Sequence, residues 1–131
     1  MSKIITATRV ETYRWDAAVD AKTTGAKVLR GPVLPSGALV TSGILLVDAA
    51  LAGGTVTDTV SLGTGEAATD VQSALARNNA LWSSPGARLV TLTPSAAPVL
   101  TTQDRAPTFT INGTGLTGGA FRLVLHIMEV V

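Results

Sequence analysis

Glu66 and Asp70 are the two residues whose types and spacing best fit general acid and base catalysis. Residues four apart share one face of a helix, so the two carboxyl groups could act on one bond. The same residues also fit the first turn of a helix, where the helix dipole favours acidic side chains. We favour the second interpretation because it explains both residues without a catalytic role.

Two glycine-rich segments have the composition of phosphate-binding loops. Residues 113–118 match G-x-G-x-x-G after a predicted strand, but a dinucleotide site needs a helix next, and here another strand is predicted. Residues 63–65, Gly-Thr-Gly, precede a predicted helix, but no lysine follows and Glu66 would repel a phosphate. We interpret the first segment as a hairpin loop and the second as a turn with a helix cap.

Metal and nucleophile chemistry has few candidate residues. His126 is the only histidine, so a histidine metal site or a Ser-His-Asp triad would have to use this one ring, which lies in the middle of a predicted strand. A structural or interface role is favoured for it. Asp16 and Asp20 flank a turn and could bind a hard cation, but they lack the spacing and the glycine of a calcium loop.

Aromatic residues and a sequon complete the candidate binding features. Tyr13, Trp15 and Trp82 could stack on a sugar ring, although core or interface packing is their default role. Residues 112–114, Asn-Gly-Thr, form a glycosylation sequon, but the Asn-Gly pair is better explained as turn chemistry. The chain contains no cysteine, which excludes disulfides, thiolate metal sites and thiol catalysis.

The amino-acid composition limits the kinds of partner that this protein is expected to bind. The 131 residues suit one domain, residues 1–131, with a single core. Hydrophobic residues make up 46% and charged residues 15%, against roughly 25% charged in an ordinary domain, which favours a partly apolar surface that meets partners. The ten Lys and Arg residues are scattered, so we expect no direct nucleic-acid ligand. The most apolar stretch, residues 44–51, is short and contains an aspartate, so we expect a soluble, cytoplasmically made protein that does not enter a membrane.

The apolar pattern has a period of two along most of the chain, which predicts strands with one buried face. We predict an all-β fold, an antiparallel, jelly-roll-like β-sandwich of about seven or eight strands with one short helix. The predicted helix covers residues 67–77, where apolar residues recur at helical spacing, and residues 94–107 are predicted to be a loop or a broken edge strand. The predicted strands are residues 4–13, 26–33, 38–47, 55–62, 88–93, 108–112 and 120–130.

The last predicted strand has the clearest alternation. Phe121, Leu123, Leu125 and Ile127 fall on a core face, whereas the opposite face is mixed and suits cover by a second sheet, a terminal arm or a neighbouring subunit. We expect this strand to pair with residues 108–112 as a hairpin, and residues 38–47 to pair with residues 55–62 across a small-residue turn. Residues 1–25 are expected to form an extended arm or an edge strand.

The order of segments in the chain resembles a known family. A polar first strand is followed by VLPSGALVTSGILLVDAAL, a Gly-Gly bend, TVTDTVSLGTG, a variable middle and a closing TFTINGTGLTGGAFRLVLHIMEVV. This order resembles small virion proteins of tailed double-stranded DNA bacteriophages, in particular capsid decoration, or cement, proteins. The resemblance implies a β-sandwich that assembles as oligomers, often trimers, on the outside of a head shell.

The resemblance leads to a functional hypothesis. We expect a structural virion protein, made in the host cytoplasm, that binds the major capsid protein on the capsid surface as a homotrimer and stabilises the shell. We expect no enzyme activity, no cofactor and no metal. The alternatives are a tail, baseplate or head-to-tail joining protein and a carbohydrate-binding module using the tryptophans. The residues expected at the capsid or subunit interface are Arg9, Arg14, Trp15, Lys27, Arg30, Arg122, His126 and Met128.

Overall fold

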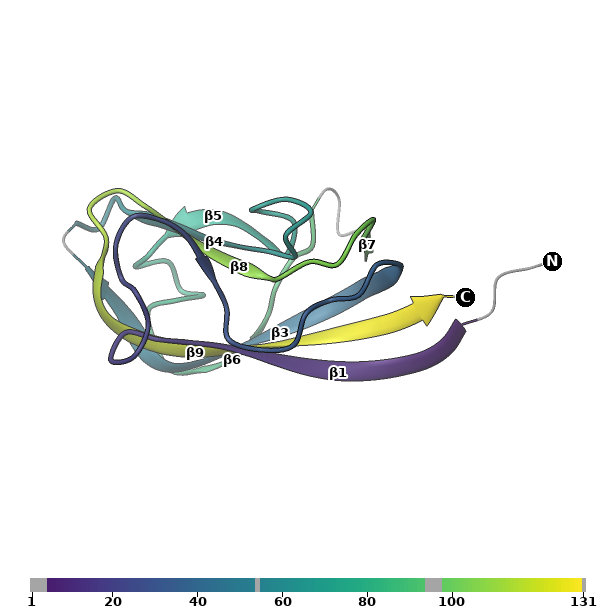
Figure 1. Ribbon diagram of the computed structural model, residues 1–131. Coiled ribbons are helices and arrows are strands. Elements are labelled where there is room, and N and C mark those ends of the chain that lie inside the picture. The colour runs from purple at the N-terminus through teal and green to yellow at the C-terminus, as the bar shows by residue number, and fades with distance from the viewer. Residues whose placement is uncertain (1–4, 54, 94–97, 131) are drawn as a thin grey trace.

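The structure, a computed structural model, describes residues 5–53, 55–93 and 98–130. These residues form nine β-strands and contain no helix, so none of them lies in a helix that could cross a membrane. The strands make two antiparallel sheets that face each other (Figure 1). The predicted all-β sandwich is therefore confirmed, and the predicted short helix is not present in the described residues.

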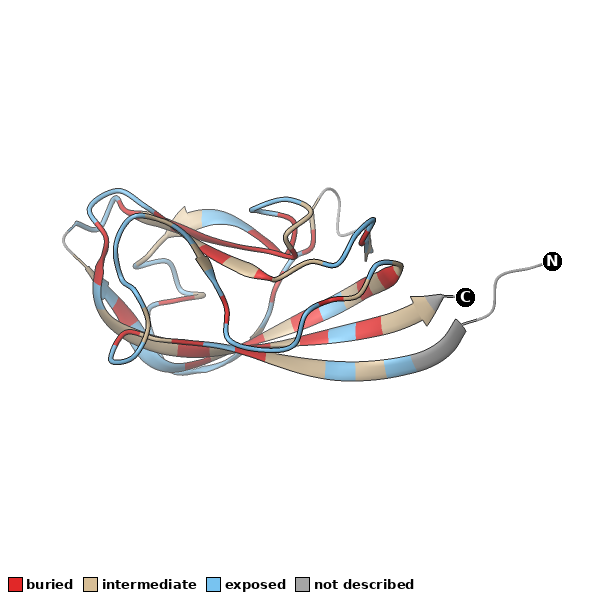
Figure 2. Ribbon diagram, in the orientation of Figure 1, coloured by how far each residue is buried: buried red, intermediate tan, exposed pale blue. Residues whose placement is uncertain are grey.

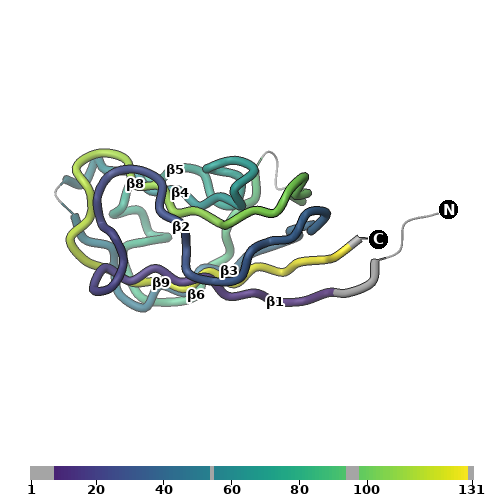
Figure 3. Tube along the Cα trace, in the orientation of Figure 1, coloured from purple at the N-terminus to yellow at the C-terminus, as the bar shows by residue number. Residues whose placement is uncertain are grey.

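The larger sheet, called here the long sheet, contains the three longest strands. Its order is β1 (Ile5–Asp16), β9 (Leu116–Val130), β3 (Ala38–Gly53) and β6 (Gly86–Leu89), with β7 (Val99–Leu100) also paired to β3. The second sheet, called here the short sheet, has the order β2 (Gly25–Val28), β8 (Thr108–Asn112), β4 (Thr59–Gly63) and β5 (Gln72–Ala76). The long strands extend past the short sheet, where the start of β1 and the end of β9 lie side by side (Figures 1 and 3).

The strand orders define a jelly roll. If the two-residue β7 is set aside, the long sheet contains the first, last, third and sixth of eight strands, and the short sheet contains the second, seventh, fourth and fifth. The chain therefore crosses between the sheets at most of its connections, as in two interlocked Greek keys. The jelly-roll-like topology predicted from the sequence is confirmed.

Both hairpins predicted from the sequence are wrong. β3 and β4 lie in different sheets, and so do β8 and β9. The glycines after β8 carry the chain across the sandwich rather than into a tight hairpin, with φ angles of 111° at Gly113 and 93° at Gly115 that favour glycine. Alternation identifies the buried face of a strand, but it does not identify the neighbouring strand.

The helix predicted over residues 67–77 is also wrong. Residues 72–76 form β5, and the residues before it form a loop. The backbone N–H of Val71 donates to the carbonyl of Leu62 at 3.0 Å, and Leu75 is opposite Val60 in the β4–β5 ladder. The buried residues of this segment thus reach the core from a loop and a strand, because pairing with β4 overrides the local helical spacing.

Every predicted strand overlaps a strand of the structure, although most differ from it in length. The predicted segment 108–112 coincides with β8 at both ends. The remaining six predicted strands overlap β1, β2, β3, β4, β6 and β9. Residues 5–16 form the edge strand of the long sheet, and residues 1–4 lie outside the described residues. The segment 94–107 contains β7, and its residues 94–97 are likewise outside the described residues.

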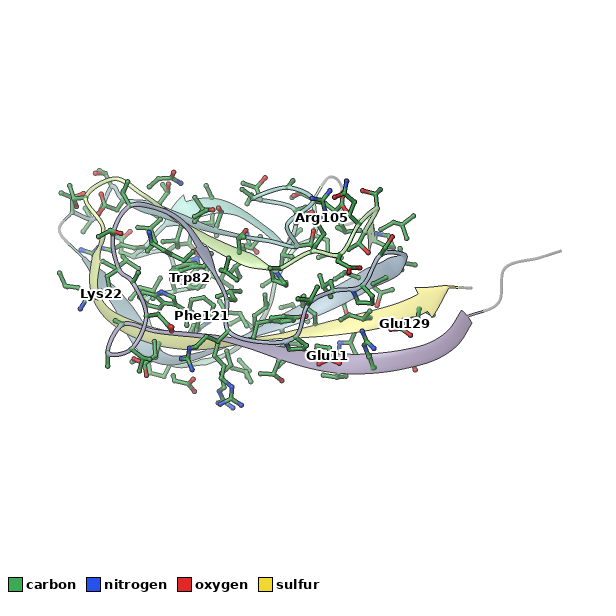
Figure 4. All side chains as sticks on the ribbon, viewed as in Figure 1. Glu11, Lys22, Trp82, Arg105, Phe121 and Glu129 are labelled. Carbon is green, nitrogen blue, oxygen red and sulfur yellow. The ribbon has the colours of Figure 1, made fainter. Side chains whose placement is uncertain are left out.

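Four aromatic rings fill the core between the sheets. Phe109 of β8 has ring centroids 5.0 Å from Trp15, 5.8 Å from Trp82 and 4.8 Å from Phe121. All four side chains are at most 1% exposed. Figure 2 shows buried residues recurring along strands of both sheets, and Figure 4 shows Trp82 and Phe121 between the sheets. This cluster joins the short sheet to the long sheet and fixes the position of their outer surfaces.

Candidate functional site

The carboxylates of Glu66 and Asp70 hold loops in place. Glu66 Oε1 accepts hydrogen bonds from the backbone N–H of Thr102 at 2.6 Å and from Arg105 Nε at 2.8 Å. Asp70 accepts hydrogen bonds from the backbone N–H and the hydroxyl of Thr64, both at 2.7 Å. Because each carboxylate already accepts structural hydrogen bonds, the paired-carboxylate arrangement considered for catalysis has no support in this geometry.

Replacement of Glu66 by glutamine should reduce the dependence of stability on acidic pH. The hydrogen bonds from Arg105, and then those from Thr102, lower the pKa of Glu66 from 4.5 to about 2. A carboxyl group with a lowered folded-state pKa stabilises the fold above its unfolded pKa, and this stabilisation disappears as the pH falls towards the folded pKa. Thermal melts of E66Q and wild type should therefore converge between about pH 4.5 and pH 2. A constant difference across that range would contradict the assignment.

The acidic pair Asp16 and Asp20 also has internal partners. Asp20 Oδ2 accepts the backbone N–H of Asp16 at 2.8 Å, and Arg30 Nε donates to Asp20 Oδ1 at 3.0 Å. The Arg30 guanidinium occupies the place where a cation would bind. Across the described residues, no group of three or more His, Cys, Asp or Glu side chains is arranged to hold a metal ion.

The tryptophans are core residues. Trp15 is 1% exposed and Trp82 is 0% exposed, so neither ring can stack on a sugar. The prediction that Trp15 lies at a capsid or subunit interface is therefore wrong for the folded chain. The cause is the period of two in β1, which points Tyr13 and Trp15 towards the short sheet. The Trp15 indole N–H donates to the carbonyl of Ala21 at 3.1 Å.

The predicted interface cations do not form one cluster. Arg9 pairs with Glu129 at 2.7 Å on the inward side of β1, and Lys27 donates to the Thr23 hydroxyl at 3.0 Å beside β2. Arg30 lies in the loop after β2, paired with Asp20 as described above. The four remaining candidates share the face of the long sheet that points away from the core: Arg14, Arg122, His126 and Met128.

This face, called here the outer face, carries many apolar side chains among polar ones. Register places Thr12, Val124, Ile44 and Leu89 side by side across β1, β9, β3 and β6. The neighbouring rows are mixed: Val10 lies beside His126 and Ser42, and Arg122, in the row with Leu46, pairs with Asp48 at 2.8 Å. The apolar residues of the outer face are Val10, Leu39, Ile44, Leu46, Leu89, Leu100, Val124 and Met128.

Several of these side chains are strongly exposed. Leu89 is 75% exposed, Leu100 54% and Val10 53%. The outward positions of the short sheet are instead mostly polar, with Thr59, Thr108, Thr110 and Asn112 in register across β4 and β8. A sandwich normally presents polar residues outward, and contiguous exposed apolar area marks an interaction surface. The asymmetry identifies the outer face of the long sheet as the candidate functional site.

A shallow hollow of about 210 Å³ lies at the projecting end of this face. Its lining includes Thr8 and Val10 of β1, Thr41 of β3, and His126 and Met128 of β9. The Nδ1 atom of His126 lies 3.2 Å from the Ser42 hydroxyl. The histidine is thus part of the outer face, as its position in the strand predicted.

The contribution of β3 and β6 to this face was not predicted from the sequence. The signal is the run of apolar residues in 38–47, which lacks the clean alternation of a strand with one wet face. Val40, Leu45 and Val47 point into the core, while Leu39, Ile44 and Leu46 are only partly buried on the outer face. A strand that is apolar on both sides indicates that something covers its second side.

Comparison with known proteins bears on the fold. No family model and no curated protein matches the sequence. A solved structure of the cyanophage Pam1 capsid asymmetric unit contains a similar chain, at 22% identity over 93% of this chain and 84% of that one, with a TM-score of 0.65. A chain in the acid-stable capsid of Helicobacter pylori bacteriophage KHP30 matches at 14% identity over 99% and 95%, with a TM-score of 0.65.

A third structure extends the likeness. A chain in the capsid of Ralstonia phage GP4 matches at 19% identity over 98% of this chain and 90% of that one, with a TM-score of 0.60. Each match spans almost the whole jelly roll. The chain therefore shares its fold with proteins in the capsid structures of three bacteriophages.

Proposed function

We propose that this chain is a structural virion protein that binds the outside of a bacteriophage capsid as a homo-oligomer and stabilises the head shell. The observation that carries the proposal is the match of nearly the whole chain to chains in three phage capsids. The partner is the major capsid protein, and the place of action is the surface of the virion. Because the matched structures are capsids, a head protein is favoured over a tail, baseplate or joining protein.

The outer face supplies the binding surface in this proposal. Its apolar rows would lose contact with water on the shell, which favours association in proportion to the apolar area buried. A protein that binds only the assembled shell stabilises it by mass action, without any chemical step. This role requires a rigid surface rather than a reactive group, and we propose no enzyme activity for the chain.

The proposal is tested by binding to heads. The purified chain should co-sediment with heads assembled from the major capsid protein of the genome that encodes it, and those heads should resist heating better than bare heads. Imaging should place many copies over the outer surface of the head. Absence of the chain from heads, or its location on the tail alone, would refute the proposal.

Leu89→Lys should abolish co-sedimentation with heads while leaving the fold intact. Leu89 is 75% exposed on the outer face, so the lysine is tolerated in the free protein but its charge would be desolvated in the bound state. The matched control is Val28→Lys in β2, where the side chain is 68% exposed on the short sheet. Equal binding by both variants would show that the shell contacts another surface.

A further inference from the structure

From Thr8 to Thr12, the edge of β1 that faces away from β9 is not paired with another strand that the structure describes. The backbone of Arg14 exchanges two hydrogen bonds with Arg30, at 2.9 and 3.1 Å, on the side away from β9. Since alternate residues of a strand direct their N–H and C=O groups to the same side, Thr12, Val10 and Thr8 also direct theirs away from β9. Within the described residues, these three make no backbone hydrogen bond outside the β1–β9 ladder.

The loop that protects this edge departs from it near Thr12. Gly31 lies over the Tyr13 ring, and a Cβ at that position would come within 2.6 Å of the ring and 2.8 Å of the Thr12 carbonyl oxygen. Beyond this point β1 projects past the short sheet together with β9 (Figure 1). A free edge of this kind is a template for another strand.

Two charged residues decide which strand fits. Arg9 and Glu11 lie on the inward side of β1 and contact each other at 3.3 Å, and Arg9 also contacts Glu129, which Figure 4 shows on the same projecting part. Inward charges usually protect an edge, because a foreign strand would bury them without a partner. Here the two charges have opposite signs and stand two residues apart. An antiparallel strand with the same two residues can therefore place its glutamate opposite Arg9 and its arginine opposite Glu11.

We propose that β1 of one copy pairs antiparallel with β1 of a second copy, with a two-fold axis at Val10. In this register Thr8 lies opposite Thr12 of the second copy, and Arg9 lies opposite its Glu11. The outward backbone groups then form about four hydrogen bonds between the copies, because Gly31 lies against the Thr12 carbonyl oxygen. The contact is isologous, so it closes a dimer, whereas the trimer implied by the family resemblance needs two different surfaces in contact.

Electrostatics selects this register over its neighbour. A shift that places Thr8 opposite Val10 would place Arg9 opposite Arg9, and like charges directly opposite each other are destabilising. In the proposed register every charge of the pair meets its complement. The arrangement also rejects unrelated strands, because their side chains would leave Arg9 and Glu11 unmatched.

The pairing joins the two outer faces into one continuous surface. The side chains of Thr8, Val10 and Thr12 all belong to the outer face, so the row at Val10 continues into the second copy. The short overlap makes the contact weak in solution. On a shell that holds two copies side by side, each copy has a high effective concentration near the other, and this favours the β1–β1 contact. The inference extends the homo-oligomer of the proposed function by naming its contact.

Disulfide trapping of the isolated protein tests the register without heads, so failure of head binding leaves the test unaffected. The chain has no cysteine, so V10C can form a disulfide only between copies. V10C should form a covalent dimer rapidly under mild oxidation, because the two positions meet at the axis. T8C alone and T12C alone should not, since like positions would be about 14 Å apart, but their mixture should form a mixed dimer.

A charge exchange tests the same contact without a covalent bond. At a concentration at which the wild type sediments partly as a dimer, R9E alone and E11R alone would oppose like charges and should sediment as monomers, whereas an equal mixture should form a heterodimer. Circular dichroism melts check that both variants fold. The inference is overturned if V10C remains monomeric on oxidation, if V10C instead crosslinks efficiently with T8C, or if wild type and both charge variants sediment as the same trimer.

Discussion

Replacement of Phe109 by alanine is expected to lower the free energy of unfolding by about 3–5 kcal/mol. Phe109 is fully buried and contacts the rings of Trp15, Trp82 and Phe121, with centroids 4.8 to 5.8 Å away. Its removal leaves a cavity between rings that are held by both sheets, so the surrounding side chains can collapse only in part. Urea unfolding should show a lower midpoint with an unchanged slope.

The neighbouring Thr110 provides the control. Its side chain points outward from the same strand, and its hydroxyl lacks a hydrogen-bond partner among the described residues. Thr110→Ala should therefore change stability by less than about 1 kcal/mol. A Phe109→Ala loss as small as that of Thr110→Ala would mean that the aromatic cluster does not couple the two sheets.

The last two strands show what sequence alone can predict. Alternation in β9 correctly assigned Phe121, Leu123, Leu125 and Ile127 to the core, because a period of two is a local property of one strand. The same alternation led to a wrong pairing of β8 with β9, which belong to different sheets. Strand partners in a jelly roll depend on contacts distant in sequence, and the glycines between β8 and β9 fit a hairpin and a crossing equally well.

The candidate site was only partly accessible from the sequence for the same reason. Arg122, His126 and Met128 follow from the alternation of β9 alone. Ile44 and Leu89 belong to the outer face because of the register in which β9, β3 and β6 pair. The register between two strands cannot be predicted from the residue pattern of one strand. The inward position of Trp15 depends on which side of β1 the second sheet covers, which is again a tertiary property.

Replacement of Asp70 by alanine is expected to lower the free energy of unfolding by about 3 kcal/mol, because two short hydrogen bonds to a buried carboxylate are lost. Asp70 is 6% exposed and Thr64 is 0% exposed, so the freed N–H of Thr64 would have no access to water. This loop also meets residues beyond β6, since the Thr93 N–H donates to the Asp70 carbonyl at 3.0 Å. Local loosening of this loop should therefore extend to the segment that follows β6.

A double-mutant cycle with Thr64→Val separates the two hydrogen bonds. Thr64→Val removes the hydroxyl that donates to Asp70 and accepts the backbone N–H of Glu66 at 3.2 Å, and it should cost less than Asp70→Ala because the Thr64 N–H still reaches the carboxylate. The double variant should be less destabilised than the sum of the single variants, since the pair shares one interaction. Strict additivity would show that Asp70 acts elsewhere. The expected coupling would establish that a residue spaced for catalysis instead closes the turn after β4, where a loop replaces the predicted helix.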